Sequence, residues 1–441
     1  MPRPRPPHSP LAPVIGLGRL IGLTFAVIAP ASSVFLTFGT AFQDAGTGIV
    51  LGYAAGSLLN LTMMLCYAEV GSRYPEAGGD YALAARALGR RVGSIYTVLF
   101  LVKGMAIPGL LALSTATYLH ELWPSLPAMG LAFAIFSLHL LLASLELRTS
   151  SLVVNAMVAI EFFVFVLFMA SGLHALHQPL QVLWHPIRES APGVRLPVPR
   201  EAWLAAATAA LYGLNGPQSC LYYSEETRTA PRQLGRTILG TAVATILVEL
   251  AAVVVGTLAL PTLVMGHQSL PLAGVVEANL GGTWGRTLLL GGISIALFDT
   301  GLATTMSYGR IFFAIARDHQ WPGALNRLAG ALSRRGTPVG ALVLLGAANF
   351  LMLALSGIHF LVTLGGTVLI VVYLGIALAS LSTRIGQSPA PYAMPLWPLA
   401  PLAALAGLGL VLAQLARFQI IVTGLIVLLG VFWWWLTPQD G

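Results

Sequence analysis

The sequence predicts an all-α polytopic membrane protein with about twelve transmembrane helices. Of its 441 residues, 56% are hydrophobic and 9% are charged, whereas soluble globular domains carry about 25% charged residues. The mean hydropathy is +0.81, and this composition excludes a soluble enzyme. The net charge of +7 does not indicate a nucleic-acid partner, because the basic residues form short clusters between apolar runs.

Twelve segments have the composition and length of a membrane-spanning helix, for which about 20 apolar residues are needed. They cover residues 14–40, 47–67, 92–119, 128–146, 150–173, 201–223, 236–261, 286–313, 338–356, 359–382, 397–415 and 418–436. The preceding residues, 1–13, are rich in proline and arginine, and we expect them to form a short cytoplasmic tail.

The basic residues predict the orientation of these segments. Seventeen of the 23 fall on the side of the N-terminus, five fall on the other side, and Lys103 lies within a segment. By the positive-inside rule, both termini and the loop at 68–91 are cytoplasmic. We expect a multi-pass protein of the plasma membrane, in a bacterium.

Two segments contain residues that interrupt a helix: the first at Ala29-Pro30-Ala31-Ser32-Ser33, and the sixth at Tyr212-Gly213-Leu214-Asn215-Gly216-Pro217. Either alone could be a simple kink, but an unpaired backbone group in hydrocarbon costs about 4–8 kcal/mol. Both segments open a set of five, and because five is odd, the second set runs inverted. Interrupted helices at matching positions of inverted repeats indicate the central site of a transporter.

This interpretation divides the chain into five parts. They are the cytoplasmic tail at 1–13, the first five-helix repeat at 14–173, an external loop at 174–200, the second, inverted five-helix repeat at 201–382, and two further helices at 383–441.

Three loops carry motifs with a characteristic order and spacing. Residues 67–81 read YAEVGSRYPEAGGDY, residues 224–227 read SEET, and residues 310–322 read RIFFAIARDHQWP before a Thr-Pro pair. These motifs resemble those of the amino acid, polyamine and organocation (APC) transporter superfamily, and the chain looks like an amino acid permease. The resemblance implies a 5+5 inverted-repeat fold of the leucine-transporter type, with discontinuous helices 1 and 6 and a substrate where these helices unwind.

Two of these loops have a physical interpretation of their own. The PEAGGDY loop is expected to support a gate, or only to set the topology. Glu225 and Glu226 lie next to Arg228 and Arg232 in the sequence, which predicts a cytoplasmic ion-pair network at the end of the sixth segment.

The chemistry expected at the two breaks suits an amino acid or an amine. The N-terminus of a half-helix presents N–H groups that bind a carboxylate, and carbonyls at a C-terminus bind an ammonium group. Tyr212 falls where relatives place an aromatic gate. The candidate substrate-binding residues are Ala29, Ala31, Ser32, Ser33, Lys103, Tyr212, Gly213, Asn215 and Gly216.

Four charged residues lie in the interior of the segments, away from their ends: Lys103, Glu161, Glu249 and Asp299. Inserting a charged side chain at the centre of a membrane helix costs about 2.5–3.5 kcal/mol, so each of these residues needs an interaction partner or a functional role. Where relatives resembling polyamine importers carry an acid, this chain has Lys103, which favours an anionic or zwitterionic substrate. Alternatively, Lys103 pairs with Glu161 or Asp299.

The coupling ion has several candidate ligands. Glu161 takes the place of a lysine that stands in for sodium in some relatives, and Thr304 and Thr305 resemble a sodium-binding hydroxyl pair. Such hydroxyls also bond back to their own helix. Glu161, Asp299, Thr304 and Thr305 are therefore the candidates, and proton coupling, sodium coupling and exchange stay open.

We therefore expect a secondary active transporter of an amino acid or related amine that works by alternating access. The alternatives are a membrane-embedded channel or enzyme and, among carriers, a polyamine or other organocation as substrate. The sequence has no HExxH motif, no nucleophile elbow and no paired carboxylates on one helix face. We expect no catalytic residue, no metal and no cofactor besides H⁺ or Na⁺. The partners are the small-molecule substrate and the lipid bilayer, and the chain is a monomer or homodimer.

Overall fold

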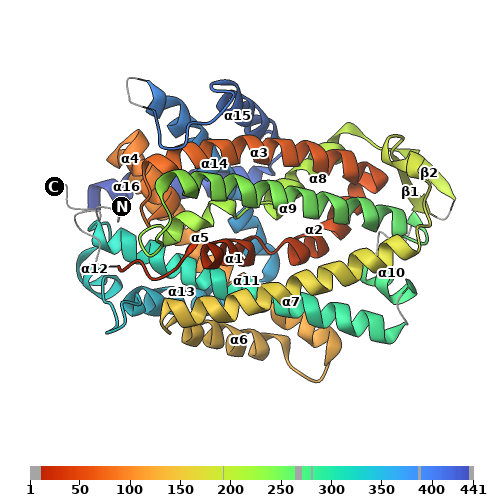
Figure 1. Cartoon of the computed structure of the whole chain (residues 1–441), viewed down its shortest axis with the longest axis horizontal. Coiled ribbons are helices and arrows are strands. Elements are labelled where there is room, and N and C mark those ends of the chain that lie inside the picture. The colour runs from red at the N-terminus through yellow and green to blue at the C-terminus, as the bar shows by residue number, and fades with distance from the viewer. Residues whose placement is uncertain (1–10, 192, 264–270, 280–281, 386–388, 437–441) are drawn as a thin grey trace.

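The computed structural model is a bundle of helices that run roughly along one long axis (Figure 1). It describes residues 11–191, 193–263, 271–279, 282–385 and 389–436. The helices are α1 (Leu17–Ile28), α2 (Pro30–Ala45), α3 (Ile49–Arg73), α4 (Gly79–Leu88), α5 (Arg90–Leu122), α6 (Ala128–Ala143), α7 (Leu147–His174), α8 (Arg200–Gly213), α9 (Pro231–Ala259), α10 (Pro271–Asn279), α11 (Thr283–Arg317), α12 (Gly323–Ala329), α13 (Val339–Leu355), α14 (Ile358–Arg384), α15 (Leu399–Leu412) and α16 (Arg417–Leu436). Short 3₁₀ turns are η1 (Gly46–Gly48), η2 (Leu180–Leu183) and η3 (Pro217–Tyr223).

Every apolar segment predicted from the sequence contains a helix, and the first and sixth each consist of two pieces, α1 with α2 and α8 with η3. Among the described residues, seven helical stretches have the length and hydropathy to cross a membrane, while α6, α13 and α15 are apolar but shorter. Large apolar side chains, including Leu141, Phe163 and Leu428, are exposed on the bundle surface. Such a surface fits a lipid environment, and the chain is a multi-pass membrane protein.

The connections contain structure that the apolar pattern did not predict. The segment expected as an external loop holds an antiparallel hairpin, β1 (Ile187–Ala191) with β2 (Val194–Pro197), so the fold is not purely helical. Helices α4, α10 and α12 are too short to be read as membrane spans. In Figure 1 the hairpin and α10 lie at one end of the bundle, and α4 and α12 lie at the other.

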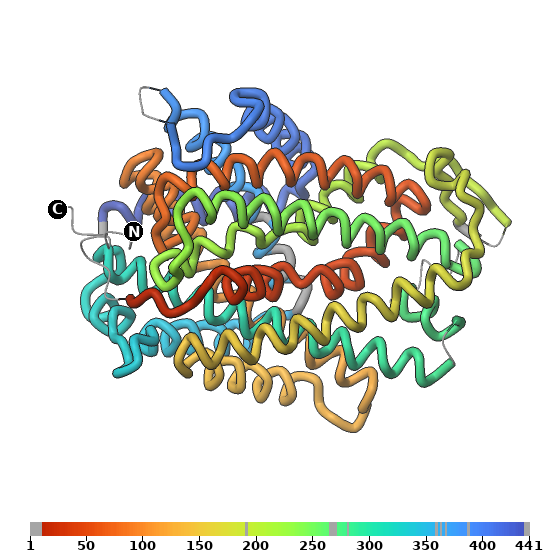
Figure 2. Tube along the Cα trace, in the orientation of Figure 1, coloured from red at the N-terminus to blue at the C-terminus, as the bar shows by residue number. Residues whose placement is uncertain are grey.

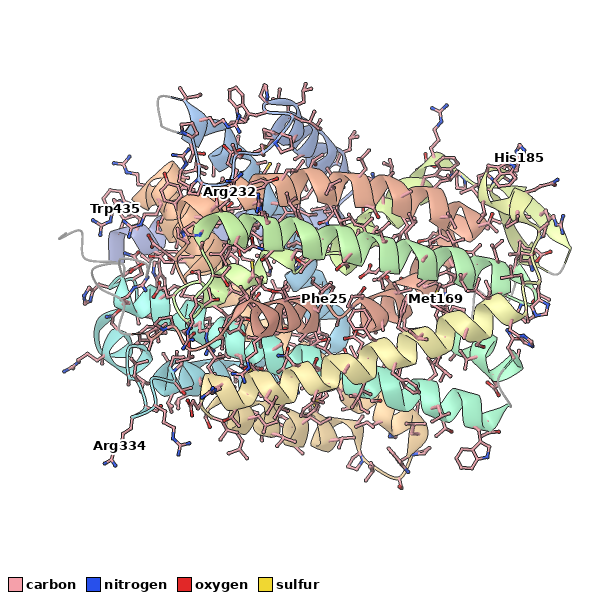
Figure 3. The ribbon with its side chains drawn as sticks, in the orientation of Figure 1. Phe25, Met169, His185, Arg232, Arg334 and Trp435 are labelled. Atoms are coloured by element: carbon pink, nitrogen blue, oxygen red, sulfur yellow. The ribbon has the colours of Figure 1, made fainter. Side chains whose placement is uncertain are left out.

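The chain starts and ends at the same end of the bundle. Figure 2 traces the first described residues and the last turns of α16 to this end. In Figure 3, Arg232, Arg334 and Trp435 lie there, whereas His185 lies at the opposite end. We call the end that carries Arg232 and Arg334 the arginine-rich end.

The two interruptions form where proline and glycine require them. Ala29 has a left-handed backbone (φ 48°, ψ 68°) that ends α1, and Pro30, which has no N–H to lose, begins α2. Helix α8 ends at Gly213, and Gly216 has φ 136°, a conformation that L side chains rarely adopt. The predicted breaks in both segments are therefore present.

The two breaks lie against each other inside the bundle. A Cβ atom at Gly216 would lie 2.8 Å from Ile28 Cγ1 and 3.1 Å from Ile28 Cα, and one at Gly213 would lie 3.4 Å from Ser33 Oγ. At Gly216 a larger residue would collide with Ile28, so glycine is needed for this close approach. In Figure 3, Phe25 of α1 marks this region near the middle of the bundle.

Helix α5 continues through Pro108 because a neighbouring helix replaces the lost hydrogen bond. Proline at this position leaves the carbonyl of Gly104 without its usual donor. Asn349 of α13 donates from Nδ2 to that carbonyl at 2.8 Å, and its Oδ1 accepts from the N–H of Gly109 at 2.8 Å. One buried amide thus satisfies the backbone on both sides of the proline.

The residues before α1 pair with the residues after η3. The N–H groups of Val14 and Ile15 donate to the carbonyl of Glu226 at 2.8 and 3.1 Å, and the N–H of Arg228 donates to the carbonyl of Ile15 at 3.0 Å. This makes an isolated parallel bridge between Ile15 and Thr227. The arginine-rich ends of the two interrupted segments are therefore joined by backbone hydrogen bonds.

Candidate functional site

The N-terminus of α2 holds a carboxylate that belongs to the chain itself. Glu161 of α7 is 2% exposed, and its Oε1 accepts from the N–H of Ala31 at 3.0 Å. A helix N-terminus attracts anions because its first N–H groups lack partners within the helix. The N–H group of Ala31, which we expected to bind the carboxylate of a substrate, therefore already donates to Glu161.

A second carboxylate, Glu249 of α9, contacts both breaks. It is fully buried; Ser33 of α2 donates to its Oε1 at 2.5 Å, and the hydroxyl of Tyr53 of α3 donates to its Oε2. A Cβ atom at Gly213 would lie 3.2 Å from Oε2 and 2.8 Å from the Tyr53 hydroxyl. Glu249 therefore lies where the first and sixth segments meet.

Asp299 of α11 is the third buried acid of this region. It is fully buried, and neither of its carboxylate oxygens has a hydrogen-bond partner among the described residues. It interacts electrostatically with Glu161, as Glu249 does. The nearby Thr305 donates to the carbonyl of Gly301 in its own helix at 2.7 Å, and Thr304 is also buried.

Lys103 belongs to a different cluster. It is 7% exposed, its Nζ lies 5.4 Å from the ring centre of Phe100, and the acid that acts on it is Asp80 of α4. The prediction that Glu161 or Asp299 pairs with Lys103 is wrong, since it forms an ion pair with neither. Asp80 lies in a loop motif outside the apolar segments, which is why a search for charges within those segments missed it.

Asp80 and the break in the sixth segment are surrounded by tyrosines. The hydroxyl of Tyr222 donates to Asp80 Oδ2 at 2.8 Å, and Asn215 Oδ1 accepts from the hydroxyl of Tyr373 at 2.9 Å and from Gln218 Nε2 at 2.8 Å. Tyr212, the candidate gate, packs against Gly366, where a Cβ atom would lie 3.2 Å from its Cζ.

Most polar groups that we predicted to bind substrate have partners within the chain. Asn215 bonds to two side chains, as above, and the Ser32 hydroxyl donates to the carbonyl of Ala29 at 3.2 Å. A ligand at the breaks therefore has to replace internal hydrogen bonds with its own.

The ion pairs at the arginine-rich end differ from those that sequence proximity predicted. Glu225 accepts from Arg317 at 2.7 and 2.9 Å and from the N–H of Ala77 at 2.9 Å, and Glu226 pairs with Arg310. The prediction of Arg228 and Arg232 as their partners is wrong. Both partners come from α11, so these pairs fasten the sixth segment to the eighth.

Two residues of the site were missed by the prediction from sequence. Glu249 was recognised as an intramembrane charge but was not assigned to the site. Tyr53 gave no signal in the sequence, because one tyrosine among apolar residues of a helix is ordinary. The available signal for Glu249 was the free-energy cost of burying an acidic side chain in a membrane, which makes such a residue a candidate for the functional site.

Comparisons with known proteins agree with this architecture. The family described as amino acid permease matches residues 15–436. The chain is similar to cationic amino acid transporter 5 of Arabidopsis thaliana, at 24% identity over 362 residues, which cover 78% of this chain and 60% of the plant protein. It is 24% identical to the branched-chain amino acid permease BcaP of Bacillus subtilis (strain 168) over 339 residues, which cover 71% of this chain and 68% of that permease. An uncharacterized transporter of Mycobacterium bovis, Mb2022c, is 26% identical over 358 residues, which cover 79% of this chain and 73% of that protein.

Proposed function

The chain belongs to the amino acid permease family, and from this premise we propose that it is a secondary active transporter that carries an amino acid or a related amine by alternating access. Membership makes it a transporter and not an enzyme. The observation that carries the proposal is the meeting of two interrupted segments at Ile28 and Gly216, beside buried carboxylates. Irregular backbone at membrane depth is tolerated where it lines a binding site.

The proposed fold has twelve membrane crossings in a 5+5 inverted repeat. Residues 14–173 form the first repeat and residues 201–382 the second, with α15 and α16 outside both. The positions of the breaks support this division, since each opens a set of five predicted segments.

The substrate is proposed to bind between the breaks, against Ala29–Ser33 and Tyr212–Gly216. Glu161 suits the amino group of the substrate, whereas Lys103 beside Asp80 suits its carboxylate. The names of the relatives point to cationic and branched-chain amino acids, so arginine and leucine are the first probes.

Counterflow in proteoliposomes tests the transport mechanism. Vesicles loaded with unlabelled arginine or leucine should take up the same labelled amino acid transiently above its equilibrium level, because the unlabelled amino acid inside competes with the label for the carrier and slows the exit of the label. Protein-free vesicles are the control. Equal uptake with and without the internal pool, for both probes, would contradict a carrier for these amino acids.

Cysteine labelling in intact bacterial cells tests the proposed orientation, in which the arginine-rich end is cytoplasmic. The native Cys66 and Cys220 are buried, while His185 and Arg334 are exposed at opposite ends of the bundle (Figure 3). An impermeant maleimide should label His185→Cys and spare Arg334→Cys until the cells are opened. The reverse pattern would overturn the orientation.

A further inference from the structure

We propose that Glu249 binds the coupling proton of this transporter, holding it between the hydroxyls of Ser33 and Tyr53 where the two breaks meet. This inference rests on the proposed function and adds the identity of the ion and the residue that carries it.

Glu249 is fully buried, and no cation faces it within the part of the chain that the structure describes. Helix α7 contributes Glu161, of the same sign, α3 contributes Tyr53, and α2 contributes the uncharged Ser33 and Thr37.

The remaining neighbours of α9 add no compensating charge. Arg19 lies at the start of α1 and is only part-buried, Tyr222 of η3 bonds to Asp80, and Glu277 of α10 pairs with Arg286 at 3.9 Å. An ionised carboxyl without a cation costs several kcal/mol in a membrane protein interior. A proton removes that cost.

The hydrogen bonds around Glu249 can serve both forms of the carboxyl group. When Glu249 is ionised, Ser33 donates to Oε1 at 2.5 Å and Tyr53 donates to Oε2. When Oε1 carries the proton, it can donate to Ser33 Oγ, because the serine hydroxyl has a second acceptor in the carbonyl of Pro30 at 3.4 Å. A hydroxyl both donates and accepts, so the proton can bind and leave without stranding a buried polar atom.

A proton fits this region better than a sodium ion does. Both carboxylate oxygens of Glu249 are held by hydroxyl donors, Ser33 at Oε1 and Tyr53 at Oε2, an arrangement that suits a proton shared by hydrogen bonds.

Because Glu249 touches Ser33 and approaches Gly213, its protonation acts on both interrupted segments. The charge of one carboxyl group changes at the point where the first segment contacts the sixth. Substrate binding at the same place therefore senses the proton directly, which is the requirement for coupling.

Infrared spectroscopy of the purified protein in lipid vesicles tests proton binding without a substrate. A pH titration should show a buried carboxylic-acid band that Glu249→Gln removes. Tyr53→Phe should shift this band, because the carboxyl loses one hydrogen-bond donor. Tyr118→Phe is the matched control, since Tyr118 is a buried tyrosine of α5 that makes no described hydrogen bond to Glu249. If Glu249→Gln leaves every carboxylic-acid band in place, the proposal is wrong.

Gradient-driven uptake tests coupling. One pH unit supports about tenfold accumulation of a probe that moves with one proton. Labelled arginine or leucine should accumulate in wild-type vesicles under one polarity of the pH gradient. Glu249→Gln should abolish this accumulation, and Glu249→Asp should restore part of it, with thermal unfolding as the check on folding.

Two other outcomes separate the inference from the function on which it rests. Accumulation driven by a sodium gradient at uniform pH, or an unchanged pH response in Glu249→Gln, would overturn proton coupling while leaving a carrier. Absence of counterflow would contradict the proposed function, and the infrared titration would then decide by itself whether Glu249 binds a proton.

Discussion

Replacing Arg310 by alanine should lower the free energy of unfolding by about 3–5 kcal/mol, because it leaves Glu226 as an uncompensated buried charge. The two side chains are 3% and 6% exposed. Arg310 Nη2 lies 3.1 Å from Glu226 Oε1, its Nη1 donates to the carbonyl of Met306 at 2.9 Å, and its guanidinium lies 4.8 Å from the ring centre of Tyr223. All of these contacts are lost together in the variant.

Denaturant unfolding in mixed micelles measures this loss. Arg86→Ala is the control, since Arg86 pairs with Glu76 at 3.0 Å but is 58% exposed, and an exposed pair is worth about 0–1 kcal/mol. The double variant Arg310→Met with Glu226→Leu should recover much of the lost stability, because no charge stays buried. Equal destabilisation by Arg310→Ala and Arg86→Ala would show that breaking the buried ion pair costs no more stability than breaking the exposed one.

Gly216→Ala should abolish binding of arginine and leucine, because the substitution forces the two breaks apart. The backbone at Gly216 has φ 136°, and this conformation by itself costs an L residue about 1–3 kcal/mol of strain. The added methyl group would also lie 2.8 Å from Ile28 Cγ1 and 3.1 Å from Ile28 Cα, so either α1 or the sixth segment must move.

Gly89→Ala separates the two causes. Gly89 has φ 92°, but a Cβ atom there would meet no atom within 4 Å, so this variant carries backbone strain without a collision. Binding by isothermal titration should survive in Gly89→Ala and vanish in Gly216→Ala. Equal affinity in both variants would mean that the substrate does not bind at the junction of the breaks.

Sequence reasoning located the breaks because their causes are local. Pro30 cannot continue α1, and Gly216 permits a backbone that other residues avoid, so both signals are present in a few consecutive residues. The membrane helices could be predicted just as well, since their apolar segments are long and nearly free of charge.

The partners of the buried charges could not be predicted in the same way. Glu226 pairs with Arg310, which is 84 residues away, although Arg228 and Arg232 are nearer in the chain. Lys103 lies beside Asp80 because α4 folds back against α5 and η3, a packing that no local pattern encodes. The assignment of Glu161 to the N–H of Ala31 likewise needs the relative position of α7 and α2.

The backbone bridge between Ile15 and Thr227 has a mechanical consequence. Residues before α1 and after η3 are 212 positions apart in the chain, yet three backbone hydrogen bonds join them. Because these bonds join the arginine-rich ends of the first and sixth segments, we expect a tilt of either end to displace the other in the same direction. A spin label at Pro13 should consequently report the motion of the sixth segment as faithfully as a label placed on that segment itself.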